Sequence, residues 1–213
     1  MYAKSENTIA AILSAAEKLF LARNYADVSM DDIAEAAGVT KGALYHHFAS
    51  KKALYLTMMH ADLKEKQALM RSGVDHPGAC RDRLRQLTES FLRQRRDKRD
   101  LIKLVRRDIN TFKGATRDKL VRAYQATLPE QVEIILRDGI RNGELAEADP
   151  RLLSWMYVAI VEVALTSYAE GVLGNHTHML DFVLNLFFEG AGESFARSRR
   201  QAKSRAASAA ASA

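Results

Sequence analysis

At 213 residues and a net charge of +6, the chain can form one domain of ordinary size or a small domain joined to a larger one. Hydrophobic residues make up 47% and charged residues 27%, a balance that excludes an intrinsically disordered chain. Three prolines and eleven glycines are too few for a sandwich or barrel of many tight turns, and helix formers dominate. The sequence therefore predicts an all-α fold.

Cysteine content and hydropathy favour a reducing cytoplasm. Cys80 is the only cysteine, so it can form neither an intramolecular disulfide nor a multi-cysteine zinc site. The first twenty residues are charged and lack the apolar core of a signal peptide. The longest apolar stretch, Trp155 to Leu165, is interrupted by Glu162 and is too short to span a bilayer. We expect a cytoplasmic, nucleoid-associated protein with no membrane partner.

The positive charge is unevenly distributed. Residues 1–55 contain six basic and six acidic side chains, whereas residues 81–107 contain eleven basic and four acidic ones. The segment from Arg197 to Arg205 adds five basic residues. A basic composition alone therefore does not identify the partner or the binding face.

The N-terminal stretch predicts a first helix and a short second one. Apolar residues recur at helical intervals from Ile9 to Phe20. Ser29 and Asp32 have the spacing of a capping box at the start of the second helix, and Gly38 is placed to end it.

A third short helix and a long fourth one follow. Thr40 is placed to cap a helix at Lys41–His47, and Ser50 to cap a helix that starts at Lys51. Two short helices joined by a tight turn, after a longer supporting helix, form a helix-turn-helix. Such a unit offers its second short helix to the major groove of DNA.

The remaining chain predicts long helices at about residues 79–95, 98–111, 115–142, 150–173 and 177–198. Pro129 is expected to kink the third of these, and Asp149 with Pro150 to begin the fourth. About nine helices result. We expect a helix-turn-helix head at residues 1–50, a helical body at 51–198, and a flexible basic, Ala/Ser-rich tail at 199–213.

Individual residues of the third helix suit DNA binding. Gly42 and Ala43 are small enough to let the backbone approach base edges, although small size alone is not specific. Lys41 can reach a guanine edge or a phosphate, and Tyr45 can give its hydroxyl to a phosphate. Lys51 begins a helix, where a cation opposes the helix dipole, so a shared anion would explain its position.

The adjacent His46 and His47 resemble a metal site only superficially. Neighbouring helical residues point about 100° apart, so they rarely bind one metal ion. No partner lies four residues away in the sequence, and neither a nucleophile–base pair nor a phosphate-binding glycine loop is present. We therefore expect no metal, no cofactor and no enzymatic activity.

The stretch "DIAEAAGVTKGALYHHFASKKAL", within a match from Ile9 to Leu54, resembles the N-terminal domain of the TetR family of bacterial transcriptional regulators. The resemblance implies phosphate contacts by Ser29, Thr40, Tyr45, His47 and Lys51. It implies positions at or near base edges for Lys41, Gly42, Ala43 and His46. It also implies a body that dimerises and binds a small molecule.

The body sequence permits both roles. Candidates for the dimer interface are the apolar residues Met156, Ile160, Val163, Leu180, Val183, Leu184, Phe187 and Ala191, which can equally form an internal core. Candidates for an effector pocket are Phe91, Arg107, Phe112, Tyr124, Trp155 and Glu162. Arg107 suits an anionic effector and Glu162 a cationic one, so the charge of the effector stays open.

The sequence thus predicts a homodimeric repressor that binds double-stranded operator DNA and is released by an apolar or aromatic small molecule. An activator or dual regulator of the same fold is the alternative. A helical ligand-binding protein without specific DNA binding is a second alternative, and a non-specific DNA binder driven by the basic tail is a third.

Overall fold

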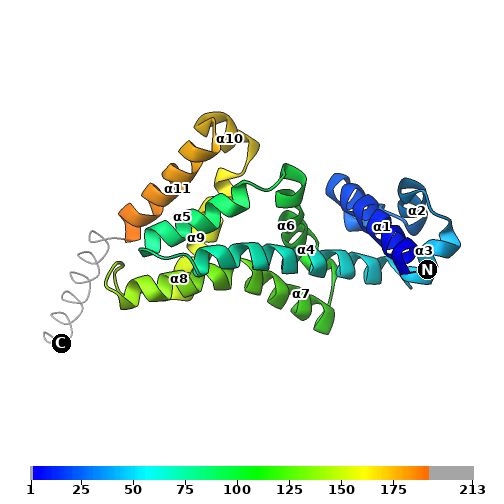
Figure 1. The fold of residues 1–213 in the computed structure, drawn as a ribbon, viewed down its shortest axis with the longest axis horizontal. Coiled ribbons are helices and arrows are strands. Elements are labelled where there is room, and N and C mark those ends of the chain that lie inside the picture. Colours follow the sequence, from blue (N-terminus) through cyan, green and yellow to red (C-terminus); the bar gives the residue numbers. More distant parts are fainter. Residues whose placement is uncertain (1, 192–213) are drawn as a thin grey trace, which may run out of the picture. The chain divides into compact units, whose positions relative to one another are not determined.

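The computed structural model describes residues 2–191, and the predicted all-α class is confirmed (Figure 1). The predicted tail at 199–213 lies outside the described residues. Within them the chain forms eleven α-helices and two short 3-10 helices, more than the nine expected. The elements are α1 (Tyr2–Ala22), η1 (Tyr25–Asp27), α2 (Met30–Ala37), α3 (Lys41–His47), α4 (Lys51–Val74), α5 (Cys80–Leu92), α6 (Arg96–Asp108), η2 (Ile109–Thr111), α7 (Gly114–Thr127), α8 (Pro129–Arg141), α9 (Pro150–Ala164), α10 (Ser167–Leu173) and α11 (His176–Ala191).

The helices form two compact units that are interleaved along the chain. The first unit contains Met1–Lys66 and Gln94–Gln125, and the second contains Gln67–Arg93 and the described residues from Ala126 onward. Helices α4 and α7 each contribute residues to both units. The expected boundary near residue 50, which would separate the helix-turn-helix head from the body, does not coincide with a division between these units and stays a prediction.

The start and end of α2 form as the sequence predicts. Ser29 Oγ accepts a hydrogen bond from the Asp32 amide at 3.0 Å, and Asp32 Oδ2 accepts one from the Ser29 amide at 2.9 Å. The hydrogen bond from the Ser29 amide to the Asp32 carboxylate holds the pKa of Asp32 below its usual value. Gly38 ends α2 with a φ of 65°, a left-handed conformation that favours glycine.

Helix α3 is fixed by the same kind of cap and by one buried residue. Thr40 Oγ1 accepts a hydrogen bond from the Ala43 amide at 3.2 Å, as the sequence predicts. Leu44 is fully buried and faces the core of the first unit, in which α1 packs against α2 and α2 against α3. Burying the Leu44 side chain contributes about 1.5–3 kcal/mol, so α3 keeps one face inward and the other outward.

Two of the predicted long helices are each divided in two. The expected helix at 115–142 breaks at Leu128, and Pro129 begins α8 because its missing amide is tolerated at the first helical position. The expected helix at 150–173 ends at Ala164, and the Thr166 hydroxyl caps α10 by accepting from the Ala169 amide at 3.3 Å. Apolar periodicity continues through both breaks and therefore conceals them.

The second unit is a bundle in which α8 packs against α9, and α5 against α8 and α11. Close approach of α5 and α8 depends on Gly139, where an added Cβ would lie 2.8 Å from Cys80 Sγ. Cys80 is itself 1% exposed. Asp149 and Pro150 begin α9 as predicted, with Asp149 Oδ1 accepting from the Leu152 amide at 2.7 Å.

Candidate DNA-binding surface

The outward face of α3 is exposed to solvent, and at Gly42 no side chain covers the backbone. Lys41, Gly42, Tyr45 and His46 are exposed, and Tyr45 has 45% of its surface accessible. A Cβ added at Gly42 would meet no atom within 4 Å, so the backbone there is open to an approaching surface. Ala43 and His47 are half-buried at the margin of this face. The structure thus brings together the α3 residues that the sequence assigned to base edges and phosphates.

Two hydroxyl groups that cap helices lie exposed beside this face. Ser29 Oγ and Thr40 Oγ1 each accept a backbone N–H bond, which uses a lone pair of the oxygen. The Thr40 hydroxyl can still donate its own proton to a further acceptor, whereas the Ser29 hydroxyl also interacts with the Asp32 carboxylate. A phosphate oxygen is such an acceptor, so one side chain can order its helix and contact the DNA backbone together.

Lys41 is paired with an acidic neighbour that the sequence analysis did not consider. Its Nζ lies 2.8 Å from Asp31 Oδ1 and 2.9 Å from Asp31 Oδ2. This hydrogen-bonded pair raises the pKa of Lys41. Both side chains are more than 60% exposed, and such pairs contribute at most about 1 kcal/mol. A DNA phosphate or guanine can therefore replace Asp31 as the partner of Lys41.

Lys51, for which a phosphate contact is predicted, donates its hydrogen bonds within the first unit. Its Nζ donates to the carbonyl oxygens of Tyr25, Ala26 and Val28 at 2.8, 3.3 and 2.7 Å. An ammonium group carries three protons, and all three are used here. Lys51 thus ties the start of α4 to the connection between α1 and α2, and this conformation leaves no proton for a phosphate.

Arg107, a predicted effector contact, is likewise committed within the protein. Its Nε and Nη2 donate to the two carboxylate oxygens of Asp108 at 2.8 and 2.9 Å. Nη2 also donates to the carbonyl oxygens of Phe20 and Arg23, at 2.9 and 3.1 Å. Asp108 is buried and also accepts from the Tyr55 hydroxyl at 3.0 Å. Arg107 therefore anchors the end of α1.

The other predicted effector contacts are distributed over both units. Phe112 and Tyr124 belong to the first unit, where Phe112 packs on Tyr25 and Tyr55 with ring centroids 5.2 and 5.5 Å apart. Phe91, Trp155 and Glu162 belong to the second unit. Phe91 is buried, Glu162 is half-buried, and Trp155 is 50% exposed, and the effector contact predicted for each stays a prediction.

The predicted dimer residues divide between surface and core. Met156 and Val163 are 53% and 66% exposed, and Ile160 is half-buried. The side chain of Ala191 lies outside the described residues. The remaining four residues are buried within the protomer, which favours the internal core left open as their alternative: Leu180, Val183, Leu184 and Phe187. Helix α11 has one apolar face that is buried and another that is exposed. The residues chosen from the apolar periodicity of its sequence lie on the buried face.

The basic residues between 81 and 107 mostly have partners within their own unit. In the second unit, Arg81 donates to Asn185, Arg83 to Asp138, and Arg85 to Asp181. In the first unit, Lys98 pairs with Glu17 and Lys103 with Asp100. Arg81, Arg83, Arg85 and Lys98 thus join neighbouring helices, whereas Lys103 pairs within α6.

The adjacent His46 and His47 have ring centroids 5.1 Å apart with an interplanar angle of 72°. Among residues 2–191, no group of three or more His, Cys, Asp or Glu side chains is arranged to hold a metal ion. In the same range no single helix meets the length and hydropathy of a membrane span, and only α9 with α10, bent by 78°, meets them as a pair.

Two family models match the chain, and the first of them covers the helices that form this surface. The family described as "Bacterial regulatory proteins, tetR family" matches residues 12–58, which include α2 and α3. The domain described as "Tetracyclin repressor-like, C-terminal domain" matches residues 77–166. The chain belongs to the TetR family. It is a DNA-binding transcriptional regulator with a helix-turn-helix, and its family consists of regulators rather than enzymes.

Relatives of this TetR-family chain include an activator. The HTH-type transcriptional activator FasR of Mycolicibacterium smegmatis is 38% identical over 38% of this chain and 36% of its own length. The probable HTH-type transcriptional regulator ArpR of Pseudomonas putida is 27% identical over 84% of this chain and 85% of its own. The crystal structure of AibR with isovaleryl coenzyme A and operator DNA has the same fold, with a TM-score of 0.70 at 22% identity over 84% of this chain and 97% of AibR.

Proposed function

We propose that this TetR-family regulator is a homodimeric repressor that binds operator DNA through α3 and is released by a small-molecule effector. The observation that carries the proposal is the exposed face of Lys41, Gly42 and Tyr45 beside the two capping hydroxyls of Ser29 and Thr40. Two such heads would enter successive major grooves about 34–36 Å apart. It would act on the bacterial chromosome in the cytoplasm.

An exposed apolar face of the second unit supports the dimer. Trp155, Met156 and Val163 on α9 are at least half exposed, as are Phe182 and Leu186 on α11. Phe182 and Leu186 are four residues apart and share one side of their helix. A large exposed apolar surface of this kind is unfavourable in water, and a second copy of the same face would cover it with twofold symmetry.

A small cavity in the second unit, lined mainly by apolar and aromatic side chains, supports the proposal of an apolar or aromatic effector. Phe91, Leu128, Tyr157 and Val161 help to line a cavity of about 10 Å³, which has no room for a ligand. Inside it, Thr88 Oγ1 and the Tyr157 hydroxyl share a buried hydrogen bond of 2.6 Å. An effector that widens this cavity would favour a body shape that holds the heads at the wrong spacing.

The activator name of FasR gives an alternative sign of regulation. Both signs use the same surface, and they differ in whether deletion of the gene raises or lowers expression from the operator. A reporter fused to that operator, with and without the gene, separates them. Higher expression in the deletion strain identifies the repressor that we propose.

Operator binding is tested by fluorescence anisotropy on the DNA that flanks the gene, with excess non-specific competitor. Thr40→Asp keeps a good N-cap for α3 but places a carboxylate where a phosphate would bind. We expect this variant to lose specific binding by about tenfold or more. Tyr168→Phe, at an exposed tyrosine of the second unit, is the control and should bind normally. If Thr40→Asp retained specific binding, the proposal that α3 recognises the operator would be refuted.

A further inference from the structure

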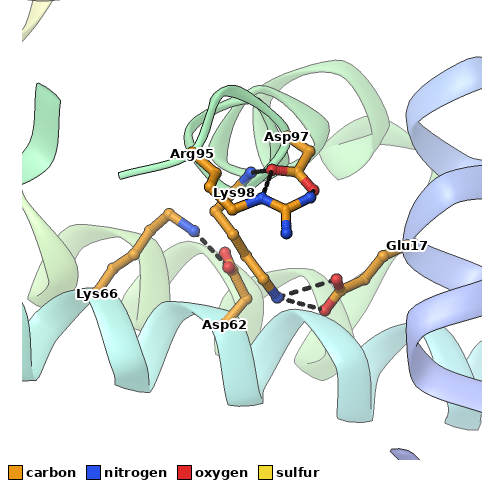
Figure 2. Close-up of polar contacts among 6 residues, drawn as sticks. All are labelled: Glu17, Asp62, Lys66, Arg95, Asp97 and Lys98. Carbon is orange, nitrogen blue, oxygen red and sulfur yellow. Dashed lines mark hydrogen bonds and ion pairs between the residues drawn. The ribbon is translucent and has the colours of Figure 1, made fainter. Parts of the chain in front are cut away.

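Two ion pairs from three helices meet inside the first unit (Figure 2). Lys98 at the start of α6 donates to Glu17 of α1, with Nζ 3.0 Å from Oε1 and 2.9 Å from Oε2. Lys66 of α4 donates to Asp62 Oδ1 one helical turn away. In Figure 2 the ammonium group of Lys98 lies between the carboxylates of Glu17 and Asp62.

The Asp62–Lys66 pair is buried and incompletely satisfied. The two side chains are 1% and 2% exposed, and burial raises the pKa of Asp62 and lowers the pKa of Lys66. Asp62 Oδ2 is buried without a hydrogen-bond donor. A buried carboxylate oxygen without a donor is costly and rare in folded proteins. Asp62 therefore has the capacity to accept a second cation.

A groove of about 380 Å³ lies on the outer side of the Glu17–Lys98 pair, between α1 and the start of α6. Its volume is within the range of small-molecule sites. The residues of α1 that give it an apolar wall are Ala10, Leu13 and Leu21. Arg95 and Asp97 at its edge are paired with each other at 2.9 Å, which leaves Glu17 and Lys98 as the inner charged wall.

We propose that this groove binds an organic cation with an apolar body. The cation would pair with Glu17. The side chain of Lys98 would then move from Glu17 and donate a hydrogen bond to Asp62 Oδ2, which has no donor of its own. No charge is then left unpaired, and the buried acceptor gains a donor. An anion would take Lys98 and leave the half-buried Glu17 without a partner, and a neutral molecule would leave Asp62 unchanged. Arg95 and Lys18 are exposed, so solvent screens their repulsion of a cation.

The site is tested with decylammonium as the probe, at concentrations below micelle formation, by isothermal titration calorimetry on the full chain. Decanol and decanoate share the alkyl chain and differ in charge. Glu17→Gln removes the charge that holds the cation, and Ala10→Trp fills the groove from an exposed position. Glu133→Gln is the matched control, because Glu133 is also a half-buried, ion-paired glutamate but belongs to the second unit. Circular dichroism checks the folding of each variant.

We expect saturable binding of decylammonium that weakens about tenfold or more in Glu17→Gln and in Ala10→Trp, and stays unchanged in Glu133→Gln. Decanol and decanoate should bind at least about tenfold more weakly than decylammonium. Equal binding of decanol or decanoate would overturn the cation assignment. Binding retained by both head variants, or no saturable binding of decylammonium, would overturn the site. Neither result depends on operator binding, so the proposed regulatory function is tested separately.

Discussion

Lys51 both donates to the carbonyl oxygen of Tyr25, at 2.8 Å, and lies over the Tyr25 ring, 4.6 Å from its centroid. The ring in turn stacks on Phe20, with centroids 5.9 Å apart, and meets Tyr55 edge-on at 5.1 Å. The start of α4 is therefore joined to the end of α1 through a cation, three carbonyls and an aromatic cluster. This arrangement holds the connection between α1 and α2 against the start of α4.

Substitution Lys51→Met is expected to lower stability without removing a phosphate contact. Loss of the charged hydrogen bonds should reduce the free energy of unfolding by about 1–3 kcal/mol. The slope of log affinity against log salt should stay unchanged, because no counterion is released at this side chain. Urea denaturation and anisotropy titrations at several salt concentrations measure both. A slope smaller by about 0.9 would instead make Lys51 a phosphate contact.

Asp31→Asn is expected to increase operator affinity. Asp31 holds Lys41 at 2.8 Å and carries a negative charge beside the DNA-binding face. Removing that charge frees Lys41 for DNA and removes a repulsion, so we expect affinity to rise about three- to tenfold at low salt. Anisotropy titration of the operator measures the change. The exposed Asp149 offers a control: Asp149→Asn also removes one negative charge, keeps a good N-cap, and should leave affinity unchanged. Equal gains in both variants would mean that only net charge matters.

The sequence predicts the head well because its signals are local. Ser29 with Asp32, Thr40, and Gly38 each act within four residues, so their spacing specifies caps and a turn that the structure contains. The contacts of Lys51, and those of Arg107 with the end of α1, could not be predicted, because the acceptors are carbonyl oxygens 23 or more residues away. Every residue has a backbone carbonyl, so the sequence does not indicate which of them accepts a hydrogen bond. A lysine at the start of a helix is therefore interpreted from sequence as part of an anion site.

The body illustrates the complementary limit. Leu184 and Leu186 are both leucines of α11, but one is fully buried and the other 51% exposed. A helix with two apolar faces gives no sequence signal for which face meets its own chain. The exposed face of α11 was not predicted. The sequence signal that could have indicated it is the four-residue spacing of Phe182 and Leu186. Effector residues were harder still, because aromatic residues occur in every core.

Leu186→Glu is expected to convert the protein to monomers while the protomer stays folded. The side chain is half exposed, so a charge there is harmful only if a second copy covers it. Leu184→Ala is the contrast, since a leucine buried in the protomer should cost about 2–5 kcal/mol of stability when truncated. Light scattering after gel filtration and thermal unfolding measure the two properties. A dimeric Leu186→Glu protein would place the interface elsewhere.

Cys80 is expected to resist thiol reagents at pH 8 in the native protein. Burial raises the pKa of its thiol from 9.0 to about 12, and the side chain is 1% exposed. Because the thiolate is the reactive form, a shift of about three pH units alone slows labelling about a thousandfold relative to unfolded chain. Labelling with Ellman's reagent in buffer and in urea reports this single cysteine. Comparable rates in both would show that α5 opens readily.

The Asp62–Lys66 pair is expected to act as a unit in stability. Lys66→Met alone leaves a buried carboxylate without its cation and should cost about 3–5 kcal/mol. In the double variant Asp62→Leu/Lys66→Met both charges are gone and the volumes are similar, so stability should return to the wild-type value or exceed it by about 1–4 kcal/mol. Urea denaturation of four proteins, the wild type, Asp62→Leu, Lys66→Met and the double variant, gives the coupling free energy. Losses that simply add in the double variant would give a coupling free energy of zero and would mean that Asp62 and Lys66 do not act as a pair in stability.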